Sequence, residues 1–168
     1  AKAINEVLPK ALAQLPPGCE VSVRHQTGPA HADSVAEAYR PLAGCAVELM
    51  PYVEDMAAMY RWADLVICRA GALTLAELTI IGRPAILVPL PNAIDNHQAV
   101  NANWLAEQDA ALVLEQSAMT PESLAALLVE TAGDPARLAG MARAALAAGR
   151  PGATVDVADV CEEVRRGR

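Results

Sequence analysis

A single glycine separates a short apolar run from a helical pattern near the middle of the chain. The apolar run covers residues 65–68, Gly71 follows it, and residues 74–81 have helical spacing. The first backbone N–H groups of a helix have no intrahelical acceptor and lie at the positive end of its dipole, so they suit a phosphate or diphosphate. Glu77 follows about one turn later, and its carboxylate can accept two hydrogen bonds from a ribose diol. The same residues also fit an ordinary strand-to-helix turn, with Thr74 as a cap and Glu77 solvated.

A second polar segment follows the apolar run at residues 85–88. After a proline-rich stretch it reads Asp95, Asn96, His97, Gln98. We expect Asp95 or Asn96 to cap the next helix, and His97 and Gln98 to lie in its first turn, facing the same mouth as the glycine turn. Neutral amide and imidazole groups suit sugar hydroxyls, which need both donors and acceptors. Simple helix capping with exposed polar side chains explains the segment equally well.

A third segment, residues 50–56, joins a strand-like run to a short helix. Backbone groups at Val53 would be able to pair with the edge of a base, and Met56 would pack on that base. A loop capped by Asp55 is the favoured alternative. His25 closes another strand-like run, where a lone histidine is more often structural, and the three histidines lack the spacing of metal ligands. We therefore expect no metal site.

The elements around these segments alternate between strands and helices. Apolar periodicity predicts helices over residues 1–15, 35–42, 54–62, 74–81 and 97–107, and strands over residues 20–25, 45–49, 65–68, 85–88 and 110–114. This order is typical of a parallel sheet with helices on both faces, where ligands bind at the carboxyl ends of the strands. The second helix is expected to stop near Gly44.

The last third of the chain has only helical signals. Thr120-Pro121 and Asp134-Pro135 each combine a capping residue with a proline at the first helical position. We therefore expect one Rossmann-like α/β domain over residues 1–168. Its strands and helices alternate to about residue 115, and a helical tail over residues 120–166 packs on it.

Composition and charge narrow the class of function. The chain has 168 residues, a net charge of −7 and 54% hydrophobic residues. It has no cationic stripe for nucleic acid and no apolar run near the roughly 20 residues that a membrane helix needs. The sequence thus predicts a folded domain that binds neither nucleic acid nor, through these residues, a membrane.

Several motifs together resemble one family of bacterial enzymes. Residues 68–77 (CRAGALTLAE), 82–89 (GRPAILVP) and 95–102 (DNHQAVNA) look like the C-terminal half of the MurG transferases, and residues 25–28 (HQTG) and 52–64 fit the same family. These enzymes have the two-domain GT-B fold and move N-acetylglucosamine from its UDP donor onto undecaprenyl-pyrophosphoryl-N-acetylmuramoyl-pentapeptide. The resemblance implies that this chain is the donor-binding half of such a GT-B glycosyltransferase.

The resemblance also implies which residues bind UDP-N-acetylglucosamine. They are Val53, Met56, Gly71, Ala72, Leu73, Thr74, Glu77, His97 and Gln98. Main-chain amides of the glycine turn hold the diphosphate, Glu77 accepts the ribose hydroxyls, and the backbone of Val53 contacts uracil with Met56 nearby. His97 and Gln98 reach the sugar hydroxyls. The family often has two adjacent glutamines at this point, so the departure at His97 makes Gln98 the firmer assignment.

The activity implied by the resemblance is inverting hexosyl transfer in peptidoglycan and cell-wall synthesis, with links to cell division and cell shape. An N-terminal acceptor domain, absent from this chain, is expected to bind the lipid-linked acceptor and to contact the membrane. The whole protein is expected to be peripheral on the cytoplasmic side of the bacterial inner membrane. No catalytic residue and no cofactor are assigned here, and the fragment alone is expected to be inactive. The alternatives are another GT-B UDP-sugar transferase, a UDP-sugar epimerase, or a non-catalytic nucleotide-binding module.

Overall fold

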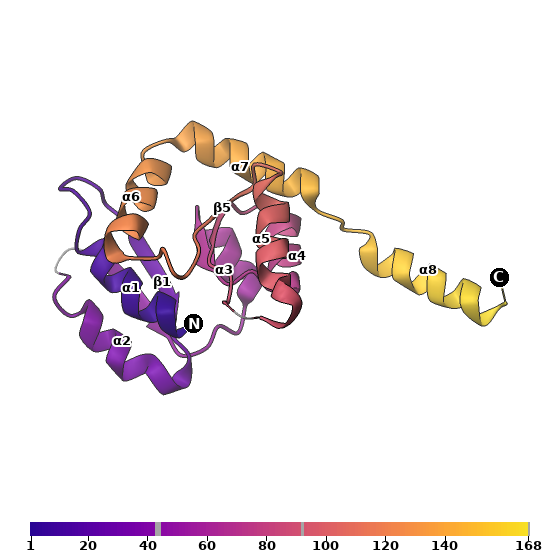
Figure 1. Cartoon of the computed structure of the whole chain (residues 1–168), viewed down its shortest axis with the longest axis horizontal. Coiled ribbons are helices and arrows are strands. Elements are labelled where there is room, and N and C mark those ends of the chain that lie inside the picture. The colour runs from indigo at the N-terminus through magenta and orange to yellow at the C-terminus, as the bar shows by residue number, and fades with distance from the viewer. Residues whose placement is uncertain (43–44, 92, 168) are drawn as a thin grey trace.

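The computed structural model describes residues 1–42, 45–91 and 93–167, and five parallel strands form two sheets within them (Figure 1). In chain order the strands are β1 (Ser22–Gln26), β2 (Ala46–Met50), β3 (Val66–Cys68), β4 (Ala85–Leu87) and β5 (Ala111–Val113). β1 pairs with β2, and β4 lies between β3 and β5. The predicted strands are confirmed to within two residues. The parallel strands and the helices beside them confirm the predicted fold class, and the strands fall into two hydrogen-bonded groups, with a cavity lined by both β1 and β3 between them.

A helix follows each strand, as the alternating pattern predicts, while α1 precedes β1 and α7 and α8 follow α6. The helices of the described residues are α1 (Lys2–Leu12), α2 (Ala32–Tyr39), α3 (Met56–Trp62), α4 (Ala72–Ile81), α5 (His97–Ala106), α6 (Pro121–Ala132), α7 (Pro135–Ala148) and α8 (Ala153–Arg165), with 3-10 turns η1 (Pro29–His31) and η2 (Ile94–Asn96). The predicted stop at Gly44 lies outside the described residues. Across the described ranges, no helix has the length and apolar character needed to cross a membrane.

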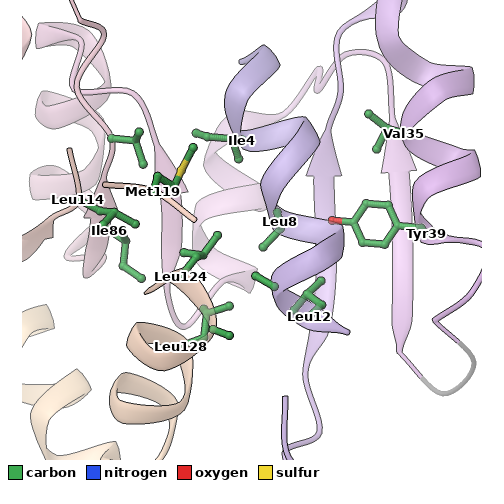
Figure 2. Close-up of a cluster of buried hydrophobic side chains, with 13 residues drawn as sticks. Ile4, Leu8, Leu12, Val35, Tyr39, Ile86, Leu114, Met119, Leu124 and Leu128 are labelled. Carbon is green, nitrogen blue, oxygen red and sulfur yellow. The ribbon is translucent and has the colours of Figure 1, made fainter. Parts of the chain in front are cut away.

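A hydrophobic cluster joins α1 to both sheets and to α6. Figure 2 shows Leu8 and Leu12 of α1 near Leu124 and Leu128 of α6, with Ile86 of β4 in the same cluster. Leu124 and Ile86 are fully buried. This packing anchors α1, which leads into β1, to the part of the chain that carries the second sheet.

The second cluster surrounds α4 and β4, the elements next to the glycine turn. Leu78 of α4, Leu87 of β4 and Leu105 of α5 are all fully buried. α4 ends at Gly82, whose φ of 72° is left-handed, and the side chain of Leu146 on α7 covers it closely. The predicted end of this helix at residue 81 is therefore confirmed, and glycine suits position 82 because an L side chain there would meet both backbone strain and Leu146.

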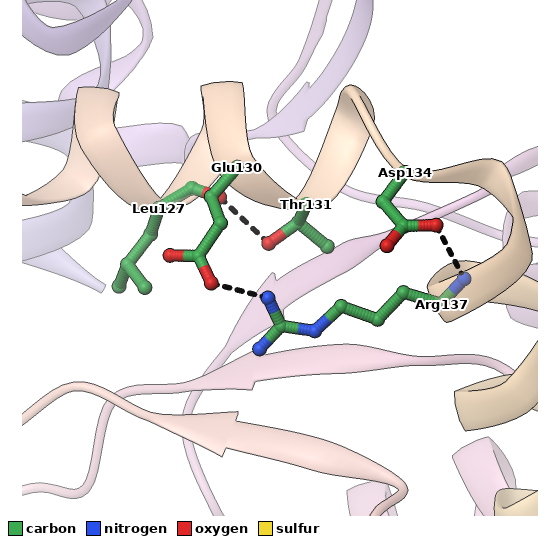
Figure 3. Close-up of polar contacts among 5 residues, drawn as sticks. All are labelled: Leu127, Glu130, Thr131, Asp134 and Arg137. Atoms are coloured by element: carbon green, nitrogen blue, oxygen red, sulfur yellow. Dashed lines mark hydrogen bonds and ion pairs between the residues drawn. The ribbon is translucent and has the colours of Figure 1, made fainter.

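The two helix starts predicted at Thr120 and Asp134 are confirmed. Thr120 Oγ1 accepts a hydrogen bond from the Ser123 amide at 3.1 Å at the start of α6. At the start of α7, Asp134 Oδ1 accepts one from the Arg137 amide at 2.8 Å (Figure 3). The Arg137 guanidinium also pairs with Glu130 of α6, so both ends of Arg137 fix the turn that brings α7 back toward α4.

The tail packs only in part. α6 contacts α1, and α7 contacts α4, as expected. All residues of α8 are exposed, and Figure 1 shows this helix extending away from the rest of the chain. The prediction that the whole tail packs on the domain is therefore wrong for α8, because the exposed Val157, Val160 and Val164 do not reach either core cluster.

His25 belongs to a buried polar network that ties β1 to α1 and α2. Its Nε2 lies 2.9 Å from Asn5 Oδ1, and its Nδ1 lies 3.0 Å from the Tyr39 hydroxyl. Asn5 Nδ2 donates to the Thr27 carbonyl at 2.9 Å, so the Asn5 oxygen accepts from His25 Nε2–H and the Tyr39 O–H donates to Nδ1. The predicted structural role of this histidine is confirmed. Burial lowers the pKa of His25 to about 4.

We predict that this network weakens in mild acid. In the unfolded chain His25 takes up a proton below its ordinary pKa near 6.5, whereas in the folded chain it stays neutral until about pH 4. The contribution of His25 to the free energy of unfolding is therefore fully present above pH 6.5. It decreases as the pH is lowered, by about 2 kcal/mol between pH 6.5 and 5, at about 1.36 kcal/mol per pH unit. Urea unfolding of His25→Gln should show a flatter pH profile, and the matched variant His31→Gln should keep the native profile. Equal profiles for the two variants would remove His25 as the cause.

Candidate functional site

The amino end of α4 lies directly after β3 and presents unpaired main-chain groups. The first intrahelical hydrogen bond runs from the Leu75 amide to the Gly71 carbonyl at 3.0 Å. The amides of residues 72–74 precede it and have no acceptor within the helix. Gly71 is the N-cap, with no side chain to occupy those amides, and a Cβ added there would lie 3.7 Å from Thr74 Oγ1. That distance is an ordinary van der Waals contact, so what glycine contributes here is the lack of a polar side chain that would cap these amides.

Glu77 is held in place by a tyrosine from the neighbouring helix. The Tyr60 hydroxyl of α3 donates to Glu77 Oε2 at 2.9 Å. Tyr60 is buried and Glu77 is exposed, so the bond fixes the rotamer of a carboxylate that still faces solvent. Burial, and then the hydrogen bond to Glu77, raise the pKa of the Tyr60 hydroxyl. Burial, and then the charge of Glu77, raise the pKa of the Cys68 thiol to about 12, so this sulfur stays protonated at neutral pH.

Arg69 joins the loops that follow β3 and β4. Its Nη1 donates to the carbonyls of Val88 and Pro89, both at 3.1 Å, and its Nη2 donates to Gln116 Oε1 at 2.6 Å. Asn101 of α5 adds a second link, from its Nδ2 to the Ala70 carbonyl at 3.1 Å. The glycine turn and the β4–α5 loop are therefore one connected unit.

The β4–α5 loop contains two non-glycine residues in the left-handed region. Asp95 and Asn96 both have φ of 53°, a conformation that costs on the order of 1–2 kcal/mol per residue. Asn96 is the N-cap of α5, but its side chain makes no capping bond, so the predicted position is right and the predicted capping bond is not. Next to it, Gln98 Oε1 accepts from the Leu90 amide at 3.0 Å, which fixes the direction of that side chain.

The structure brings some of the predicted site residues together and leaves others on a neighbouring surface. Met56, Thr74 and Glu77 line one cavity, the same cavity that β1 and β3 border. His97 and Gln98 lie in the first turn of α5, as predicted, and α5 is another helix that contacts α4.

The remaining predicted residues differ in burial. The side chain of Val53 is buried, whereas Leu73 is 82% exposed. The loop containing Val53 ends at Asp55, whose Oδ1 accepts from the Ala58 amide at 2.8 Å, so the alternative of a capped loop is confirmed for Asp55. Among residues 1–42, 45–91 and 93–167, no cluster of His, Cys, Asp or Glu has the arrangement of a metal site.

Sequence reasoning missed the residues that position this site. Tyr60 and Arg69 stand inside the motifs quoted above, but nothing in their spacing indicates that one orients Glu77 and the other joins two loops. A parallel sheet with free helix amides at its carboxyl edge is the architecture of nucleotide-binding α/β domains.

The comparisons with known proteins agree with this class. The glycosyltransferase family 28 C-terminal domain matches residues 1–158 of the chain. The chain therefore belongs to this family.

Curated relatives extend the comparison to particular enzymes. A UDP-N-acetylglucosamine–N-acetylmuramyl-(pentapeptide) pyrophosphoryl-undecaprenol N-acetylglucosamine transferase from Azotobacter vinelandii is 49% identical over 99% of this chain and 47% of its own length. The enzyme of that name from Cellvibrio japonicus is 51% identical, over 99% of this chain and 46% of its own length. The chain thus spans about half the length of the curated relatives it matches.

A solved structure confirms the fold class. The crystal structure of Acinetobacter baumannii MurG has a TM-score of 0.90 and 41% identity, covering 96% of this chain and 48% of that chain. The resemblance to MurG transferases and the fold of the C-terminal half of a GT-B glycosyltransferase are both confirmed.

The bond between Tyr60 and Glu77 gives a prediction that needs no ligand. Tyr60→Phe removes one part-buried hydrogen bond to a charged group and should lower the free energy of unfolding by about 1–2 kcal/mol. Tyr52→Phe is the matched control, because Tyr52 is 70% exposed, and it should change stability by less than about 0.5 kcal/mol. Urea denaturation measures both, and equal values would show that the bond contributes nothing to folding.

Proposed function

We propose that this chain binds UDP-N-acetylglucosamine in the donor half of a peptidoglycan N-acetylglucosaminyltransferase. The observation that carries the proposal is the row of helix amides at residues 72–74 with Glu77 one turn further along, in a chain of this family. The amides suit the diphosphate, and the carboxylate suits the ribose diol. Relatives at about half identity are named for the same donor and a lipid-linked acceptor.

The other donor contacts follow from the places of the neighbouring helices. Met56 and the backbone of Val53 lie at the start of α3, on the side of α4 from which Tyr60 reaches Glu77. We assign uracil to that side. His97 and Gln98 lie on the α5 side, and we assign the sugar hydroxyls to them.

The proposed reaction is an inverting displacement at C1 of N-acetylglucosamine. An acceptor hydroxyl forms the new bond to C1 as the bond to the UDP oxygen breaks, and UDP leaves with the electron pair. Negative charge therefore develops on the diphosphate, next to the positive end of the α4 dipole. Donors fixed in advance stabilise such charge at little reorganisation cost, which is the role we assign to residues 71–74.

The acceptor side of the reaction is proposed to belong to the rest of the polypeptide. The matched relatives are about twice as long as this chain, and their name includes a pyrophosphoryl-undecaprenol acceptor, which is a lipid. We assign the acceptor site, the general base and the membrane contact to that other part, at the cytoplasmic face of the inner membrane. No residue of this chain is given a catalytic role.

Removal of the Glu77 carboxylate should weaken donor binding. Glu77→Ala removes hydrogen bonds between a charged group and the ribose, a loss of about 1.5–3 kcal/mol, or roughly 10- to 150-fold in dissociation constant. Titration calorimetry with UDP-N-acetylglucosamine on the complete polypeptide measures it. Glu107→Ala is the control, because it removes the same charge from an exposed position at the end of α5.

A second ligand makes the assignment to ribose specific. A dideoxy analogue of UDP lacks both ribose hydroxyls, so Glu77→Ala should not weaken its binding further. An equal loss of affinity for UDP and for the analogue would show that Glu77 does not bind the ribose hydroxyls. If Glu107→Ala weakens donor binding as much as Glu77→Ala does, the loss of affinity comes from the change in net charge and not from a contact of Glu77.

A further inference from the structure

Tyr60 connects the hydrophobic core to the carboxylate that we assign to the ribose. Its side chain is 5% exposed and belongs to the same cluster as Leu78 and Leu87, whereas Glu77 is exposed. The Tyr60 hydroxyl donates to Glu77 Oε2 at 2.9 Å. A packed ring is confined to one position, while an exposed glutamate by itself has several rotamers. The bond therefore extends the order of the core to a side chain at the surface.

The bond also holds Glu77 on the side of α4 where the cavity lies. Thr74 and Glu77 are three residues apart, so they share one face of α4, and both line the cavity. Tyr60 and Met56 of α3 line it as well, and α3 packs against α4. A diphosphate held by the amides of residues 72–74, as proposed, would have its ribose beside this face. The rotamer that Tyr60 selects is therefore the one that faces the cavity.

The charge of the Glu77 carboxylate is left for a ligand. No ion pair among residues 1–42, 45–91 and 93–167 involves Glu77. The nearby Tyr60 hydroxyl and Cys68 thiol are both neutral at neutral pH, because burial raises the pKa of each. A carboxylate offers about four lone-pair sites, and the Tyr60 hydroxyl occupies one of them. Enough sites remain for the two hydroxyls of a ribose diol.

A mobile glutamate would bind the same diol less tightly. Fixing one free glutamate side chain weakens binding by up to roughly 30-fold, because its rotamer freedom is lost when the ligand binds. A side chain already held in the binding rotamer avoids most of this loss. Ligands without the diol do not use the carboxylate, so their affinity does not depend on its order. The Tyr60 hydroxyl therefore affects selectivity as well as affinity.

We propose that Tyr60 is a positioning residue that makes the donor site select nucleotides with an intact ribose diol. It holds the Glu77 carboxylate in the rotamer that faces the cavity, and it needs no contact with the ligand itself. This role rests on the proposed function, because it requires Glu77 to accept the ribose hydroxyls. It adds the group that sets the preference for ribonucleotide over deoxyribonucleotide donors.

Binding of UDP and of its dideoxy analogue to the complete polypeptide tests this role. Titration calorimetry, at a temperature where circular dichroism shows each variant folded, should find UDP weakened by about 5- to 20-fold in Tyr60→Phe and the analogue by less than about twofold. Tyr39→Phe is the matched control, since Tyr39 is 7% exposed and its hydroxyl bonds to His25 Nδ1 at 3.0 Å. It removes a buried hydroxyl from the other core cluster, so both affinities should stay within about twofold of the native values.

A double variant shows whether Tyr60 acts through Glu77. In the Glu77→Ala background, Tyr60→Phe should change the affinity for UDP by less than about twofold, because the group that it positions is gone. Equal weakening of UDP and of the analogue by Tyr60→Phe would overturn the role, and so would a loss that persists without Glu77. Either result would mean that Tyr60 supports the fold of the site in general.

The same measurements separate this role from the proposed function. If Glu77→Ala weakens UDP binding and Tyr60→Phe does not, the donor site stands and the positioning role is wrong. If the native polypeptide does not bind UDP, or if Glu77→Ala leaves its affinity unchanged, the proposed function fails and the positioning role fails with it.

Discussion

The pairing of β3 with β4 is the constraint on which the candidate site depends. It places the ends of two strands side by side, and the Arg69 guanidinium then holds the carbonyls that follow β4 while Gln116 anchors its other nitrogen. Hydrogen bonds to a charged group contribute more to stability than neutral ones, and those of the Arg69 guanidinium join the loops that follow three strands. The amides of α4 and the first turn of α5 keep a fixed relation because of it.

Burial around this pair makes the relation rigid. β4 is fully buried, and Leu78 and Leu105 clamp α4 and α5 against it. Close-packed interiors transmit small displacements rather than absorbing them, so α4 cannot shift along β3 without disturbing both neighbours. The exposed polar groups at the first turns of α4 and α5 are thus held by β4 and by buried helix faces whose side chains are mostly apolar.

Local signals in the sequence were sufficient for the elements and for the glycine turn. The helix starts at Thr120 and Asp134 and the stop at Gly82 are matters of neighbouring residues, and the structure has each of them. The pairing of Tyr60 with Glu77 and the bridge made by Arg69 depend on contacts 17 to 47 residues apart, which periodicity does not encode. The division of the strands into two groups is not visible in local patterns either, because an apolar strand looks identical whether its edge is paired or faces a cavity. The helical tail was expected to pack on the domain along its whole length, yet the valines of α8 are exposed among the described residues.

The bond from the Leu90 amide to Gln98 gives the mouth a chemical direction. That amide occupies one lone pair of the Gln98 oxygen, so Gln98 offers a ligand chiefly the hydrogens of its nitrogen. An ionised Glu77, by contrast, can only receive hydrogens, and the amides of α4 can only give them. A ligand that spans the first turns of α4 and α5 must therefore place acceptors at the amides and at Gln98 and donors at Glu77. The same ligand bound in the reverse orientation would place donor against donor and acceptor against acceptor.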